Sequence, residues 1–435
     1  MTNTLYEKEI KELLGMKSIL LKYGIVYPIT SPPMKGADVR IENGKITHIG
    51  YDLPVHEGTE VIDVSGKYVF PGFIDVHTHL GLYDEGTGWA GNDANETIET
   101  MTPHVRAIDS VYPLDPGFRD AIEHGITTVH IMPGSANVIG GTTAVIKTYG
   151  KNVENMIIKQ PAGLKIALGE NPKRMHSQGN KESLTRMGIM GMLRETFYNA
   201  KYSDWPHDFR TIPIIQALNR EIPIRVHAHR ADDILSAIRL ADEFGLDLRI
   251  EHCTEGHLIA EELQGRNLQV SVGPTLTRRS KVELKNKSWK TYKILCDAGV
   301  HVSITTDHPY TPIQYLHICA AIAVREGLDE QKALEGITIL PARNLGVDDR
   351  VGSLEVGKDA DIVVWNYHPF HYIATPIFTM INGEIIYKKI NKKTIYFLHR
   401  FKYDIKGYMR NIRSKLYIDA TVREGNGAPP AMCWF

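Results

Sequence analysis

The middle of the chain consists of short, uninterrupted apolar runs separated by segments long enough to form a helix, such as Ala231–Phe244. Uninterrupted apolar runs are typical of parallel strands that are covered on both faces. These runs lie at Tyr68–Val76, Thr127–Met132, Thr143–Thr148, Gly163–Leu168, Ile222–His227, Leu248–Glu251, Leu268–Val272 and Val300–Thr305. They predict an α/β protein in which residues 67–345 form a (β/α)8 TIM-like barrel. A doubly wound sheet is the alternative, but no glycine-rich phosphate turn follows Val76.

The segments on either side of the barrel, residues 18–66 and 346–390, read as short strands with turns. Asn43-Gly44 and Asn382-Gly383 are typical hairpin turns. Neither segment is long enough to bury a core alone, so we expect the two to pack together as one small composite β-sandwich. Residues 391–435 are rich in lysine and arginine, and we interpret them as a basic C-terminal extension with a solvated face.

The overall charge and the cysteine pattern exclude several classes of protein. Lys and Arg number 50 against 51 Asp and Glu, so the chain lacks the basic field of a nucleic-acid-binding protein. It has no apolar run of ~18 residues, and no membrane span is expected. The four cysteines are far apart and form no CxxC pair, which fits a reducing compartment. We therefore expect a cytoplasmic protein.

Metal-binding and basic side chains gather where the apolar runs end. His77 and His79 follow the first run at i and i+2, and therefore point to the same face of a strand. Later runs end in, or contain, Lys165, His227, His252 and Asp307. The carboxyl ends of barrel strands all face one mouth, so these side chains are expected to converge there. Imidazole nitrogens converging in this way indicate a metal site.

Several motifs along the chain resemble those of the amidohydrolase superfamily, specifically its imidazolonepropionase-related and metal-dependent prolidase-like branch. They lie at residues 69–79 (VFPGFIDVHTH), 125–129 (GITTV), 226–229 (VHAH), 250–252 (IEH), 306–308 (TDH), 341–346 (PARNLG) and 352–361 (GSLEVGKDAD). The resemblance covers about residues 18–388 and implies a distorted (β/α)8 barrel with a metal site at its mouth.

The resemblance also implies a set of metal ligands. His77 and His79 would bind one divalent cation, and His227 and His252 a second. Asp307 would contact the first cation and act as general base. The metal is expected to be Zn²⁺, with one or two ions per chain.

Two residues compete for the position that bridges the metals. Lys165 matches the lysine that members of the superfamily convert to N6-carboxylysine with carbon dioxide. Burial favours the neutral amine that this reaction needs. Glu170, just past the same predicted strand, is the alternative and would ligate without any modified lysine. Both assignments remain open from the sequence.

Other polar residues near the predicted mouth are candidates for substrate binding. His229 faces the same way as His227, and His130 lies at another strand end. Arg230 offers a guanidinium for a substrate carboxylate or for a surface ion pair. Glu251, directly before His252, is interpreted as a residue that orients that ligand.

The sequence therefore predicts a hydrolase that cleaves the C–N bond of an amide, lactam or dipeptide-like small molecule with a metal-activated hydroxide. A deaminase of a ring amidine that uses a single metal is the alternative. A non-catalytic scaffold on the same fold is a third possibility, although scaffolds are expected to lose ligands and all of these remain. The resemblance further implies a homo-oligomer.

Overall fold

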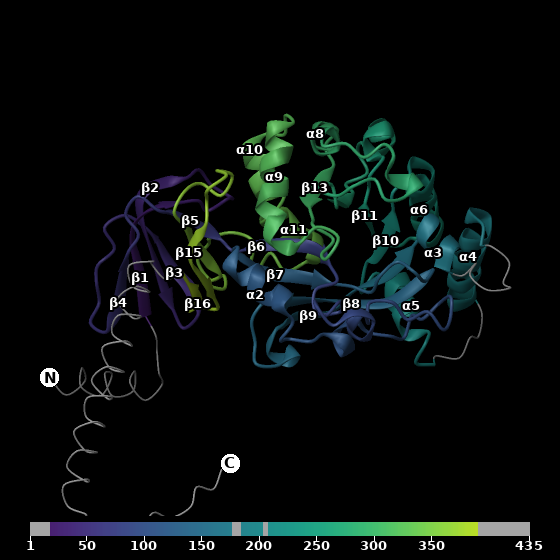
Figure 1. Cartoon of the computed structure of the whole chain (residues 1–435), viewed down its shortest axis with the longest axis horizontal. Helices are drawn as coiled ribbons and strands as arrows, with labels where there is room; N and C mark the ends of the chain where they lie inside the picture. The colour runs from purple at the N-terminus through teal and green to yellow at the C-terminus, as the bar shows by residue number, and fades with distance from the viewer. Residues whose placement is uncertain (1–17, 176–183, 203–207, 390–435) are drawn as a thin grey trace, which may run out of the picture. The chain divides into compact units, whose positions relative to one another are not determined.

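The computed structural model describes residues 18–175, 184–202 and 208–389 (Figure 1). They form two sheets of eight strands each, and the strand order of the second is β13-β12-β11-β10-β9-β8-β7-β6. Its strands are β6 (Phe73–Thr78), β7 (Ile126–Ile131), β8 (Ile139–Lys147), β9 (Ile157–Ala167), β10 (Ile224–Ala228), β11 (Leu248–His252), β12 (Gln269–Val272) and β13 (His301–Ile304). Each of the eight predicted apolar runs contributes a strand to this sheet, as expected.

The second sheet is nearly closed into a barrel. Its two outer strands approach each other, because Thr78 and His308 form a parallel bridge and the His79 N–H donates to the His308 carbonyl at 2.9 Å. The closure brings the end of the first barrel strand beside the residues that follow the last one. Segments from the two ends of the barrel sequence, at Thr78–His79 and His308, thus meet at one place.

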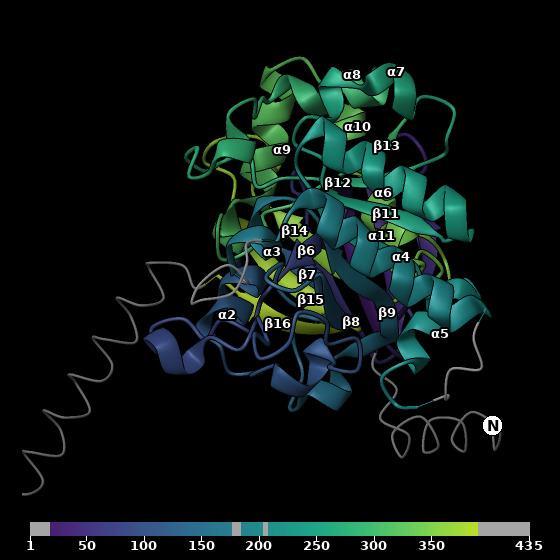
Figure 2. The same cartoon turned by 90° about the vertical axis from the view of Figure 1, so that its right-hand side faces the viewer.

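Helices lie around this sheet, as Figure 2 shows for α4, α6 and α8. Helix α6 packs on β10 and β11, and α8 and α9 pack on β13. The helices are α2 (Pro116–Glu123), α3 (Glu170–Met175), α4 (Arg186–Tyr202), α5 (Ile212–Leu218), α6 (Ala231–Phe244), α7 (Ala260–Leu263), α8 (Lys290–Asp297), α9 (Leu316–Arg325), α10 (Glu330–Glu335) and α11 (Ile339–Leu345). The helix expected at Ala231–Phe244 is confirmed with the same bounds.

One barrel strand runs against the expected direction. Strand β8 contains the run Thr143–Thr148 and was expected to be parallel, but it pairs antiparallel with both β7 and β9. The physical reason is the short connection from β7, residues 132–138, which is long enough for a hairpin loop but too short for a helical crossover. The sheet is therefore mixed rather than wholly parallel.

The first predicted barrel run also divides between the two sheets. Tyr68–Pro71 forms β5 of the other sheet, and the barrel strand β6 begins at Phe73. Gly72 separates them and lies so close to Thr127 that a Cβ there would be 1.9 Å from the Thr127 Oγ1. Only glycine permits this approach, so the chain changes sheets at this residue.

The first sheet joins the two flanking segments of the chain. Strand β14 pairs antiparallel with β5, which pairs with β1, so residues from both flanks share one hydrogen-bonded sheet. Its order is β16-β15-β14-β5-β1-β2-β3, with β4 pairing to β1. The strands are β1 (Ser18–Val26), β2 (Met34–Glu42), β3 (Lys45–Gly50), β4 (Thr59–Asp63), β5 (Tyr68–Pro71), β14 (Ile362–Trp365), β15 (Pro376–Ile381) and β16 (Glu384–Lys388). The sandwich form and the domain boundaries stay predictions.

The predicted basic extension at residues 391–435 lies outside the described residues. Within residues 18–175, 184–202 and 208–389, none of the helices has the length and apolar character needed to span a membrane.

Candidate metal centre

Two histidines at the end of β6 direct one ring nitrogen each toward Asp307. The Nδ1 of His77 lies 2.8 Å from the Glu251 Oε2, and the Nδ1 of His79 lies 2.8 Å from the Met132 carbonyl oxygen. These contacts fix both rings, so that the Nε2 atoms face inward. Each Nε2 lies 3.4 Å from the Asp307 Oδ1. The HxH pair and the aspartate, far apart in sequence, therefore converge as the sequence predicted.

Asp307 is held in an unusual backbone conformation by a network that starts in β6. Its φ is +54°, in the left-handed region that aspartate adopts only with support. The support comes from buried Asp75, which accepts hydrogen bonds from the Thr305 hydroxyl at 2.5 Å and from the Thr306 hydroxyl and N–H. Burial raises the pKa of Asp75 to about 6, although these hydrogen bonds oppose the rise. Asp75 thus ties the segment that carries Asp307 to the strand that carries His77.

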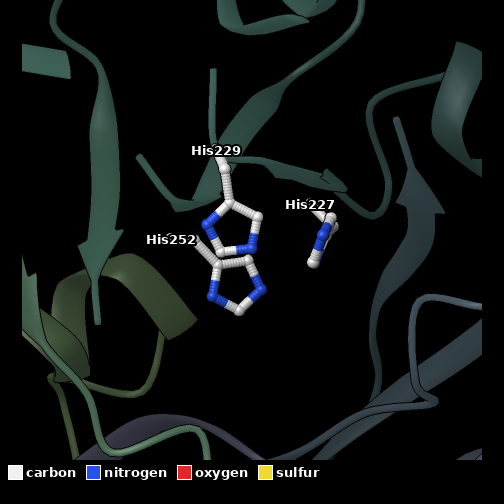
Figure 3. A group of neighbouring side chains, drawn as sticks. All are labelled: His227, His229 and His252. Atoms are coloured by element: carbon white, nitrogen blue, oxygen red, sulfur yellow. The ribbon is translucent and has the colours of Figure 1, made fainter. Parts of the chain in front are cut away.

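Three further histidines gather beside this pair, and we call them the three-histidine group: His227 in β10, His229 just after it, and His252 at the end of β11. Figure 3 shows their rings around one space. Ring centroids are 4.3 Å apart for His227 and His252, and 4.5 Å apart for His229 and His252. One ligand atom from each lies within 4.8 Å of the others. The group therefore has the donors and spacing for a metal ion.

Lys165 lies inside the barrel between these elements. It belongs to β9 and is 1% exposed, with its Nζ 3.5 Å from the His77 Nε2 and 3.0 Å from the Met132 Sδ. Burial lowers the pKa of its ammonium to about 8. The neutral amine is therefore easier to form near neutral pH than in an exposed lysine, and the Nζ lies beside a proposed metal ligand.

The orphaned polar atoms of the site fit a cation. Among the described residues, neither ring nitrogen of buried His227 has a hydrogen-bond partner, and the same holds for the Asp307 Oδ1. Burial lowers the pKa of His227 and His252 well below the usual range, so both rings are neutral and can donate lone pairs. Neutral imidazoles and a carboxylate are the donor types that zinc prefers. Bound cations would satisfy one nitrogen of His227 and the Asp307 Oδ1.

Glu251 acts on a different histidine from the one expected. Its carboxylate contacts His77 through Oε2 and accepts a hydrogen bond from Arg225 at 3.0 Å through Oε1, whereas His252 binds the Gly273 carbonyl. The interpretation that Glu251 orients the adjacent His252 is therefore wrong. The regular strand conformation ends at His252, whose φ is +73°, so its ring turns to Gly273 while Glu251 extends to His77 of β6.

Three residues proposed from the sequence do not belong to the groups of converging ligand atoms. Both ring nitrogens of His130 contact the protein, at the Val76 carbonyl and the Thr143 hydroxyl. Arg230 is partly exposed and forms two hydrogen bonds with Asp232. Glu170 begins α3, where it lines a cavity of about 400 Å³ together with Arg230.

Sequence reasoning missed two buried carboxylates of the site. Asp75 lies two residues before His77 in the same strand, and that spacing was a usable signal because both side chains share a face. Glu283 lies in the loop after β12 and approaches the three-histidine group. No pattern around Glu283 marks it, since its position is set by the folding of a long loop.

Residues 68–390 match the profile of the Amidohydrolase family. The chain belongs to the amidohydrolase family. This family is metal-dependent, and the predicted superfamily resemblance is confirmed. The chain is accordingly an enzyme of the hydrolase class that acts on carbon–nitrogen bonds, as the sequence predicted.

Known proteins of this family resemble the chain to different extents. A crystal structure of an amidohydrolase from Thermotoga maritima MSB8 superposes with a TM-score of 0.82 and 42% identity, covering 85% of this chain and 100% of that one. Amidohydrolase tasK of Hapsidospora irregularis is 29% identical over 80% of this chain, which spans only 39% of tasK. An imidazolonepropionase from Colwellia psychrerythraea (strain 34H) is 26% identical over 79% of this chain and 90% of that protein.

Proposed function

We propose that this amidohydrolase cleaves the C–N bond of an amide, lactam or dipeptide-like small molecule in a metal-dependent reaction. The observation that carries the proposal is the meeting of His77, His79 and Asp307 with the three-histidine group at one end of a nearly closed barrel sheet. We also propose that this sheet is the family's (β/α)8 barrel and that the other sheet folds as a β-sandwich. A homo-oligomer remains a prediction.

The proposed ligands divide into two sets. His77, His79 and Asp307 would hold one divalent cation, for which zinc is the best match to the donors. His227 and His252 would hold a second, with Lys165 between the sets after carboxylation. When bound, such a cation lowers the pKa of water toward neutrality and polarises a carbonyl oxygen.

The protein's own groups would move the proton. The Asp307 carboxylate would accept a proton from the attacking water and deliver it to the leaving nitrogen. Asp75 and the threonines that it binds would keep that carboxylate aimed between the ligand nitrogens. Glu251 would hold His77 in the tautomer that presents Nε2.

A screen of N-acyl amino acids, dipeptides and cyclic amides with zinc present tests the reaction. We expect turnover of at least one compound, with one or two zinc ions per chain by elemental analysis. A deaminase of a ring amidine would instead turn over only amidines and carry one metal. Metal-free protein that gains no activity with any divalent cation would support the scaffold reading and contradict the proposal.

Lys165 is expected to carry a carbamate. Its neutral amine would attack carbon dioxide, forming an N–C bond and releasing one proton, and the new carboxylate replaces a buried cation with an anion. Incubation with ¹³C-bicarbonate and zinc should give a carbamate carbon signal that is absent from Lys165→Met. Full activity of carbon dioxide-depleted enzyme, together with no such signal, would overturn the assignment.

Acid is expected to destabilise the metal-free protein. Burial lowers the pKa of His308 and His317 to about 4, and lowers that of His227 and His252 further below the usual range. The unfolded chain protonates these imidazoles near ~6.5, so it gains more protons than the folded state as the pH falls below that value. The free energy of unfolding should therefore decline from about pH 6.5 toward pH 4. Thermal melts at about pH 7.5 and about pH 5 measure this, and equal Tm values would contradict it.

A further inference from the structure

Glu283 brings a buried carboxylate to the three-histidine group from a distant part of the chain. It lies in a short 3-10 helix, Val282–Leu284, and is 1% exposed. Its Oε1 lies 3.8 Å from the His227 Nε2 and 3.9 Å from the His229 Nε2. Its Oε2 accepts the Glu170 N–H at 3.0 Å. One carboxylate oxygen is therefore anchored while the other faces two imidazoles.

The atoms that face each other here are only partly satisfied by the protein, because the Glu283 Oε1 has an ion-pair partner in Lys281 but no hydrogen bond. Within the described part of the chain, the Glu283 Oε1 and both His227 ring nitrogens are buried without a hydrogen-bond partner. A buried carboxylate without a full complement of partners is costly. The Glu283 Oε1 therefore lies beside the Nε2 atoms of both His227 and His229, where a shared cation would bind all three.

We propose that Glu283 is a carboxylate ligand of the cation bound by the three-histidine group. The inference rests on the proposed function and adds a ligand to the His227 and His252 pair. Carboxylate oxygen and imidazole nitrogen both bind zinc at ~2.0–2.1 Å, which places neighbouring tetrahedral ligands roughly 3.4 Å apart. The separations of 3.8 and 3.9 Å exceed this by a margin that small side-chain rotations can close.

Glu283, rather than Glu170, is the acidic residue that we propose for the second site. Glu170 follows β9 closely in sequence, but it contributes its backbone N–H to Glu283. The carboxylate that faces the histidines comes instead from the loop after β12. The chain therefore places a carboxylate where the sequence suggested one, but from a different segment.

Lys281 supplies a countercharge that a cation would compete with. Its Nζ lies 3.0 Å from the Glu283 Oε1 and also donates to the Asn171 Oδ1 at 3.1 Å. The ammonium neutralises the carboxylate and repels any cation that approaches it. If Glu283 is a ligand, removing Lys281 should strengthen cation binding, whereas removing Glu283 should weaken it.

Zinc titration of metal-free protein tests the proposal. The parent, Glu283→Gln, Lys281→Met and the control Glu170→Gln are stripped with a chelator and titrated with Zn²⁺ by calorimetry, with bound zinc counted after gel filtration. We expect Glu283→Gln to weaken one zinc site by at least about tenfold, since even residues that only support ligands cost that much. Lys281→Met should tighten the same site, and Glu170→Gln should match the parent.

The affected site is identified with a second background. The His77→Ala variant should lose the first zinc site and keep the zinc that depends on Glu283. The double variant His77→Ala/Glu283→Gln should therefore lose that zinc as well. Far-UV circular dichroism checks folding, and Glu283→Asp keeps the charge if Glu283→Gln misfolds. Unchanged zinc affinity in Glu283→Gln would overturn the inference. If that variant misfolds, unchanged zinc affinity in both single variants, Glu283→Asp and Lys281→Met, would overturn it. If the zinc affinities change as expected but the substrate screen finds no C–N hydrolysis, the result would instead count against the proposed function alone.

Discussion

Replacement of Asp307 with asparagine is expected to lower kcat by about 10²–10⁴-fold, the usual contribution of a positioned general acid–base group. The amide has the same shape, but it accepts no proton at the working pH and carries no negative charge for a cation. The Asp307 side chain lies beside His77 and His79 of the site, so its replacement should change the site and leave the fold intact. Steady-state kinetics on the best substrate from the screen and zinc content per chain measure both effects.

The matched control for this change is Asp349→Asn, at an exposed position outside the site. It should keep parental kcat and zinc content. A kcat for Asp307→Asn close to that of this control would remove Asp307 from the reaction. If Asp307→Asn binds less zinc but has the kcat of the control once it is saturated with zinc, Asp307 acts only in metal binding.

Replacement of Asp75 with asparagine is expected to lower metal affinity and kcat by about 10–100-fold, as for other residues that orient ligands. Asp75 accepts hydrogen bonds through both oxygens, from two hydroxyls and from the Thr306 N–H. An amide presents a donor to one of these partners, and an unsatisfied buried donor costs about 1–3 kcal/mol. The left-handed turn at Asp307 should then relax, and its carboxylate should move away from the ligand nitrogens.

A positioning role for Asp75 is separated from a purely structural one by two measurements. Thr306→Ser keeps the hydroxyl donor and should retain near-parental zinc affinity, whereas Thr306→Val should resemble Asp75→Asn. Thermal melts report any loss of stability. If Asp75→Asn lowers Tm but leaves kcat and zinc affinity of the folded, zinc-loaded protein unchanged, the residue serves only the fold.

Much of the barrel could be predicted because burial of a strand on both faces produces a local sequence pattern that can be recognised. Covered strands are mainly apolar, so the predicted runs Ile222–His227 and Leu248–Glu251 overlap the observed strands β10 and β11. The i, i+2 spacing of His77 and His79 likewise fixes their shared face within one strand. These properties depend on residues that are close along the chain.

Contacts between distant segments could not be predicted in the same way. The direction of β8 follows from a connection too short for a crossover, and an apolar run reads the same in either direction. The partner of Glu251 is His77 because strands β6 and β11 face each other across the barrel. Glu283 approaches His227 through a loop whose path no local pattern encodes.

The sequence by itself determined which strands form the barrel and which residues are competent metal ligands, because periodicity and side-chain chemistry are local properties. Only the tertiary structure decided which further residues lie beside these candidate ligands. Asp75 supports Asp307, and Glu283 faces the three-histidine group, because barrel closure and loop folding bring distant residues within bonding distance. Such distances depend on the packing of the whole sheet, which no single segment specifies.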